Sequence, residues 1–266
     1  MTKRVNTAQQ MKYVFAILVI GCLCVFFTSA YTTKALNPPP QSGGSISGKI
    51  TFPRVPPKNT VWTVTKNKNI CGHEKPLDRI IVDKNGGVAN AFIYVKDMSS
   101  VHNTNTGTKY AINQHECRYA PHAQVVPVGA TVTVSNSDDV LHNIHGYFFA
   151  DHSTAFNIAQ PIQNQQTPVP MNKPGLIEVQ CDAGHTWMNA YIYVADNPYV
   201  AVSASDGSFS INNVPSGNYT IECWHEGWNV TDDRGGRPIF SPPQILDQSI
   251  TVNDGANAHA DFQLHQ

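Results

Sequence analysis

Three side chains of types that can bind soft metal ions lie close together in the sequence, between residues 181 and 188. Cys181, His185 and Met188 occupy the segment CDAGHTWM, with three residues between the cysteine and the histidine and two between the histidine and the methionine. Each side chain alone has an ordinary structural explanation, as buried packing or as a polar loop residue. A thiolate, an imidazole and a thioether from one short loop form the soft ligand set that suits copper cycling between Cu(I) and Cu(II). The segment therefore predicts a copper site.

The loop that carries these side chains lies between two expected strands. Apolar and β-branched residues over 176–180 and 189–194 predict a strand on either side of it. A site of this kind needs one more histidine from elsewhere in the sheet. His142 is the candidate, because a strand expected over 131–135 is followed by an Asn-Ser-Asp-Asp turn and then by His142 and Asn143.

The order of these segments resembles the cupredoxins, the plastocyanin and amicyanin family of blue copper proteins. In that family a Gly turn, a strand ending in N-x-D and a His-Asn pair precede a C-x(2,4)-H-x(2,4)-M loop. Both motifs occur here in that order, within residues 121–196. The resemblance implies one type 1 copper ion with three trigonal ligands and a weak axial one, in the order His142, Cys181, His185 and Met188. His145 is a competing candidate, but the family pattern selects the histidine directly followed by asparagine.

The resemblance also implies roles for neighbouring residues. Asn143 would donate its backbone N–H to the Cys181 sulfur, while its side chain ties the two ligand loops together. His185 would present its ring edge to partners, with Trp187 beside it as an apolar docking surface. The Cys–His spacing is one residue longer than in plastocyanin or amicyanin and one shorter than in azurin, whereas the His–Met spacing has the amicyanin-like length.

The function implied is outer-sphere transfer of single electrons between protein redox partners, without catalysis and without a small-molecule substrate. Two other hypotheses stay open: a copper-binding or delivery protein without fast electron transfer, and a metal-free surface adhesion β-module. The sequence lacks the paired H-x-H motifs of multicopper oxidases and the common catalytic signatures. With 18 basic and 19 acidic residues, it also lacks a basic field that would hold nucleic acid.

Cys71 and Cys117 allow two interpretations. The first is a second metal ion bound by both sulfurs and by some of the nearby histidines, namely His73, His115 and His122. The second, which the sequence favours, is a disulfide, because disulfides persist in the compartments outside the cytoplasm. Cys223 is then left over, and we expect it to be a small buried hydrophobic residue.

Short β-branched and aromatic runs between turn residues predict an all-β protein. The resemblance implies a cupredoxin-like Greek-key β-sandwich over residues 45–197. Residues 198–266 resemble the smaller transthyretin-like, carboxypeptidase-regulatory β-sandwich, because DGSFSINNVPSGNY follows the turn and strand order of that module. The expected strands cover residues 46–52, 79–83, 89–95, 131–135, 176–180, 189–194, 199–204, 219–224, 248–252 and 258–264.

The first thirty residues read as a signal peptide. They combine a basic start, fourteen apolar residues from Val14 to Phe27 and a small-residue cleavage site ending at Ala30. Residues 31–44, which contain three consecutive prolines, read as a linker. We therefore expect a periplasmic or extracellular protein. An uncleaved N-terminal anchor and a lipid-modified Cys22 are the alternatives, and either would attach the chain to a membrane.

Overall fold

The computed structural model describes residues 43–53, 60–99 and 108–265. All of them belong to the second of two compact units, Pro40–Gln266. The predicted signal peptide over 1–30 and nearly all of the predicted linker lie outside the described residues. Within the described ranges, no helix has the length and apolar character needed to cross a membrane.

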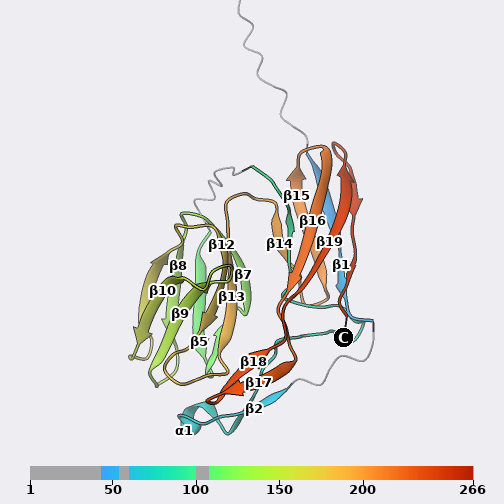
Figure 1. Ribbon diagram of the computed structural model, residues 1–266. Coiled ribbons are helices and arrows are strands. Elements are labelled where there is room, and N and C mark those ends of the chain that lie inside the picture. Colours follow the sequence, from blue (N-terminus) through green and yellow to red (C-terminus); the bar gives the residue numbers. More distant parts are fainter. Residues whose placement is uncertain (1–42, 54–59, 100–107, 266) are drawn as a thin grey trace, which may run out of the picture. The chain divides into compact units, whose positions relative to one another are not determined.

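The predicted all-β fold is confirmed: the described chain consists of strands and loops apart from one short helix, α1 (Lys68–Cys71) (Figure 1). Two facing sheets form a first β-sandwich, called here the central sandwich. One sheet runs β10–β9–β12–β13–β7, and its strands are β7 (Ala123–Pro127), β9 (His142–Phe148), β10 (Thr154–Gln160), β12 (Gly175–Gln180) and β13 (Asn189–Ala195). The other runs β11–β8–β5–β6, and its strands are β5 (Tyr110–His115), β6 (Arg118–Ala120), β8 (Thr131–Asn136) and β11 (Gln166–Pro170).

The alternation of side chains along β8 shows why these segments form a sandwich. In the sequence TVTVSN, Val132 and Val134 are fully buried, while Thr131 is exposed. This period of two is typical of a strand with one face in a core. Val134 belongs to the same apolar core as Ile144 of β9 and Ile192 of β13, so the two sheets share one interior.

A second β-sandwich combines strands from both ends of the described chain. One of its sheets runs β14–β4–β16–β19, and its strands are β4 (Phe92–Val95), β14 (Val200–Val202), β16 (Gly217–His225) and β19 (Gln244–Val252). The other contains β1 (Gly44–Thr51), β15 (Ser208–Val214), β20 (Asn257–His259) and β21 (Phe262–Gln263). Its buried core includes Ile46 of β1, Ile93 of β4 and Ile221 of β16.

The predicted division into 45–197 and 198–266 is wrong for two strands. β1 pairs with β15 and β20, and β4 lies between β14 and β16, although both precede residue 197 in the sequence. The physical reason is that the β15–β16 segment, whose two strands belong to different sheets, cannot bury its apolar faces by itself. Strands from the start of the chain complete its two sheets, and local turn signals contain no information about such long-range pairing.

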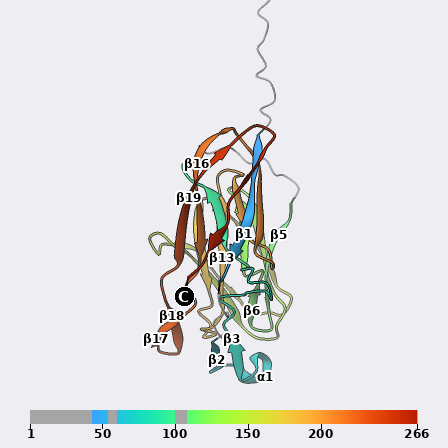
Figure 2. The same cartoon turned by 90° about the vertical axis from the view of Figure 1, so that its right-hand side faces the viewer.

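Other strand predictions also need correction. The segment 79–83 forms no regular strand and contributes only an isolated bridge between Val82 and Val88. Two short hairpins were not predicted: β2 (Val61–Thr63) with β3 (Glu74–Pro76), and β17 (Val230–Arg234) with β18 (Arg237–Phe240). Figure 2 shows β2, β3 and α1 at the same end of the molecule as β17 and β18, and Figure 1 labels β2 and α1 at that end as well.

Replacing Ile46 by Ala tests the position of β1 in the second sandwich. Ile46 is fully buried, so Ile46→Ala should lower the free energy of unfolding by about 2–5 kcal/mol through lost burial and a residual cavity. Urea unfolding followed by circular dichroism measures the change. Ile245→Ala in β19 is the control, since Ile245 is 55% exposed and its loss should cost about 0.5 kcal/mol or less. Equal small losses in both variants would contradict the pairing of β1 with this core.

Candidate metal centre

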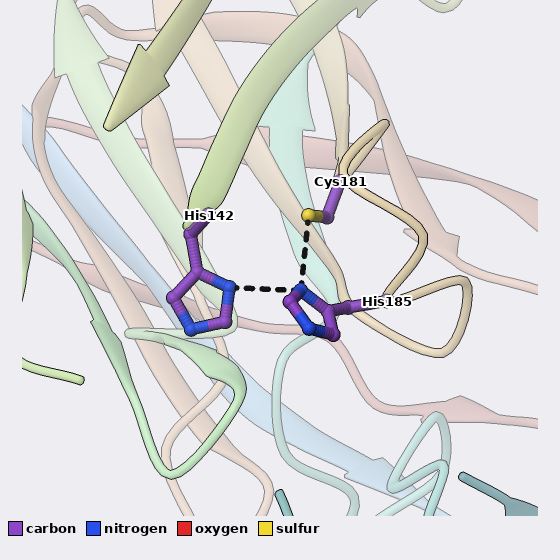
Figure 3. A group of neighbouring side chains, drawn as sticks. All are labelled: His142, Cys181 and His185. Atoms are coloured by element: carbon purple, nitrogen blue, oxygen red, sulfur yellow. Dashed lines mark hydrogen bonds between the residues drawn. The ribbon is translucent and has the colours of Figure 1, made fainter. Parts of the chain in front are cut away.

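Three of the four predicted ligands converge in one buried pocket (Figure 3). The Nδ1 atoms of His142 and His185 are 3.0 Å apart, and the Sγ atom of Cys181 is 3.6 Å from Nδ1 of His185. Their ligand atoms all lie within 4.8 Å of one another, and all three side chains are 0% exposed. Two imidazole nitrogens and one sulfur therefore face a common point, out of reach of bulk water.

The antiparallel pairing of β9 with β12 brings the ligands together. His142 begins β9, and Cys181 directly follows the last residue of β12, so both lie at the same end of these neighbouring strands. Gly184 has φ +95°, a conformation that side chains other than glycine rarely adopt, and it turns the loop so that His185 comes back beside Cys181.

Met188 ends the same loop. It is 2% exposed, it donates its backbone N–H to the carbonyl of His185 at 3.0 Å, and it is followed at once by β13. Its place in the buried loop agrees with the predicted sequence pattern, while its role as an axial ligand stays a prediction.

The Cys181 sulfur lies among backbone N–H groups. Burial raises the pKa of the Cys181 thiol, and the N–H groups of Asn143, Ala183 and His185, which hydrogen-bond the sulfur, oppose this rise. Asn143 also accepts the Asp182 N–H through Oδ1 at 3.1 Å. Asn143 thus joins the strand of one predicted ligand to the loop of the others, while its role beside a bound metal stays a prediction.

The two histidines are held as neutral imidazoles. Burial, together with the neighbouring His142, lowers the pKa of His185 to about 4. Burial also lowers the pKa of His142, although Asp138 opposes this effect. Neutral rings keep a lone pair on one nitrogen, which is the form that binds metal ions. A buried set of two lone pairs and one sulfur fits a soft cation such as copper.

Hydrogen bonds at the outer nitrogens determine which nitrogen faces the pocket. His142 Nε2 lies 2.8 Å from Oδ2 of Asp138, and His185 Nε2 lies 3.0 Å from Oδ1 of Asn67. Both partners accept a hydrogen bond, so each Nε2 carries the proton and each Nδ1 is left with its lone pair. Burial by itself would raise the pKa of Asp138, but hydrogen bonds from Cys117 N–H, His142 and Glu116 N–H bring that pKa below its usual value.

The predicted docking surface at His185 is wrong. His185 is 0% exposed and Trp187 only 4%. Two covering segments meet over the ligand loop: Lys66 Nζ donates to the Ala183 carbonyl at 2.6 Å, and Arg237 of β18 donates to the Cys181 carbonyl at 3.0 Å. These contacts join segments far apart in the sequence, which the spacing of the ligands could not reveal.

The other candidate ligands have different roles. His145 lies on the face of β9 opposite to His142, because it is three positions further along the strand, an odd number. Its Nδ1 contacts Oδ2 of Asp182 at 2.6 Å, and its ring stacks on Tyr147. Cys223 is a buried free cysteine, and burial raises the pKa of its thiol to about 12.

Cys71 and Cys117 are joined by a disulfide, which excludes their sulfurs from a second metal site. Of the three histidines considered for that site, His115 has a side chain that is 60% exposed, and His122 contacts Glu226. In the described part of the chain, a second group of possible ligand residues comprises Cys117, Asp138 and His142, but it shares His142 with the first site and contains a disulfide sulfur.

Sequence reasoning missed Asp138 and Asn67. Asp138 was visible as part of the turn before His142, and its spacing of four residues from the histidine was the available signal. Asn67 is 118 residues away from His185 and lies in a segment without a motif, so nothing in the sequence connected the two.

Comparisons with known proteins give weak matches. No protein-family model and no curated protein sequence matches the chain. Among solved structures, the chain is similar to a purple cupredoxin from Nitrosopumilus maritimus, with 19% identity over 33% of this chain and 100% of that chain and a TM-score of 0.27. Amicyanin from Paracoccus versutus matches with 15% identity over 39% of this chain and 97% of that chain, at a TM-score of 0.29. A Cu-containing nitrite reductase from Thermus scotoductus SA-01 matches with 19% identity over 33% of this chain and 22% of that chain, at 0.28. Sequence identities and TM-scores this low support no conclusion about function.

Substitution of two histidines on the same strand tests which of them binds the metal. His142→Gln should lower the affinity for Cu(II) by at least about 100-fold, because it removes one of three buried ligands. His145→Gln should leave the affinity within about threefold of the wild type, since His145 faces away from the pocket. Competition titration against a chelator of known affinity measures both values. Equal losses in the two variants would contradict the assignment of His142.

Proposed function

We propose that this chain carries single electrons with one type 1 copper ion, held by the trigonal ligands His142, Cys181 and His185. The observation that carries the proposal is the convergence of these three ligand atoms within 4.8 Å of one another in a fully buried pocket. When bound, copper supplies a one-electron redox couple. Met188, in the same loop, is proposed as the weak axial ligand.

The residues around the pocket suit such a couple because they hold the ligands in fixed positions. Asp138 and Asn67 orient the two imidazoles, and backbone N–H groups surround the Cys181 sulfur. Burial keeps water away from the ligands. Ligands that cannot rearrange freely keep the same geometry in both oxidation states, which lowers the structural cost of moving an electron.

The two alternative functions receive less support. A metal-free adhesion module would leave the ligand side chains too far apart to meet, whereas they lie together. A delivery protein would expose its metal for transfer, whereas all three trigonal ligands are 0% exposed. Redox proteins are therefore the proposed partners, in an exported protein that is not itself an enzyme. The Cys71–Cys117 disulfide supports export, since disulfides persist in oxidising compartments.

Copper loading tests this function directly. Purified protein with one equivalent of Cu(II) should show an intense visible charge-transfer band from thiolate to copper and a reversible one-electron wave in voltammetry. Cys181→Ser should abolish the band. Cys223→Ser, which changes the other buried free cysteine, should retain it. Absence of the band in the wild type, or its survival in Cys181→Ser, would contradict the proposal.

A further inference from the structure

Each ligand histidine has its outer nitrogen, Nε2, hydrogen-bonded to a residue that is connected to one of the two cysteines of a single disulfide. On one side, Cys117 donates its backbone N–H to Oδ2 of Asp138 at 2.8 Å. The same carboxylate oxygen lies 2.8 Å from Nε2 of His142. One disulfide half is therefore connected to the first imidazole through a single carboxylate.

The other half of the disulfide reaches the second imidazole through helix α1. Asn67 directly precedes this helix and Cys71 is its last residue. The N–H groups of Ile70 and Cys71 donate to the Asn67 carbonyl at 2.9 and 2.8 Å, so one helical turn connects the two residues. The Asn67 side chain then accepts the hydrogen bond from Nε2 of His185. The position of Asn67 is thus tied to that of Cys71.

The residues that connect the disulfide to the two histidines are largely buried or are held by backbone hydrogen bonds. Cys71 and Cys117 are 1% and 0% exposed, and Asp138 is 8% exposed. The Cys117 carbonyl also accepts the Nε1–H of Trp187, two residues beyond His185, at 3.0 Å. Cys117 thus contacts the ligand loop directly, in addition to the connections that run through the two histidines.

We propose that the Cys71–Cys117 disulfide positions the copper ligands: it fixes Asp138 behind His142 and Asn67 behind His185, and so closes the pocket over His185. The inference rests on the copper site proposed above. In the absence of the disulfide, the segment that carries Asn67 loses its cross-link to Cys117 and the central sandwich. Its side chain then holds His185 less firmly, and the metal leaves more easily.

The sharpest test changes Asn67 alone, because the helix and the disulfide stay in place. Asn67 has φ 54° and ψ 42°, a left-handed conformation that glycine adopts freely and aspartate tolerates. Asn67→Gly removes the acceptor without straining the backbone, and Asn67→Asp retains an acceptor at the same place. In Asn67→Gly, copper should transfer to an excess of chelator about 10–100-fold faster than in the wild type, the range usual for loss of a group that orients a ligand. Asn67→Asp should stay within about threefold of the wild type.

The disulfide itself is tested by the double variant Cys71→Ala with Cys117→Ala. It should release copper at least as fast as Asn67→Gly. In electron paramagnetic resonance, both variants should change the copper hyperfine splitting relative to the wild type, and in the same direction. Cys223→Ala is the matched control, since it removes a buried sulfur in the core of the second sandwich and should change neither readout. If the double variant does not fold, the Asn67→Gly and Asn67→Asp pair decides.

The outcomes separate this inference from the proposed function. A wild-type protein without the charge-transfer band overturns the copper site. A wild-type band with unchanged release and unchanged hyperfine splitting in Asn67→Gly overturns the positioning role and leaves the copper site standing. In the metal-free protein, nitrogen-15 spectra of the imidazoles give an independent readout: Asn67→Gly should speed solvent exchange of the His185 Nε2–H proton, and equal exchange in both proteins overturns the inference.

Discussion

The structure depends on the burial of two imidazoles and a thiol in one pocket. Polar groups removed from water are costly unless each finds a partner. Here the outer nitrogens of His142 and His185 find Asp138 and Asn67, and the sulfur of Cys181 is surrounded by backbone N–H groups. Among the described residues, the two inward nitrogens lie against each other, and that of His185 also lies against the sulfur. A cation bound between them is the partner that this arrangement suits best.

Strand pairing places the ligand side chains in the pocket, and separate segments of the chain cover it. The antiparallel pair β9 and β12 brings His142 to Cys181, and the loop before β13 returns His185 to the same place. The region from β2 to β3 and the hairpin β17–β18 then close the pocket from outside. If the site carries electrons as proposed, a redox partner would approach it through these covering segments rather than at the edge of His185.

Short-range sequence patterns were sufficient to pick out the three side chains that converge in the pocket, but not Asp138 and Asn67, which hold the two imidazoles. Cys181 and His185 lie in one loop with recognisable spacing, and His142 follows a strand and turn with a recognisable order, so short-range patterns located all three. The β-rich composition likewise predicted the all-β fold. The contact of Asn67 with His185 and the pairing of β1 with β15 join residues more than one hundred positions apart. Such contacts are set by how the whole chain packs, and no local pattern records them.

X-ray absorption at the copper edge of the loaded protein tests the central claim most directly, because it reports the atoms bound to the metal. The predicted result is one short copper–sulfur distance together with two imidazole nitrogens, and loss of the sulfur contribution when residue 181 is serine. A copper environment made only of nitrogen and oxygen atoms would contradict the account, since it would show that the buried thiol of Cys181 does not bind the metal.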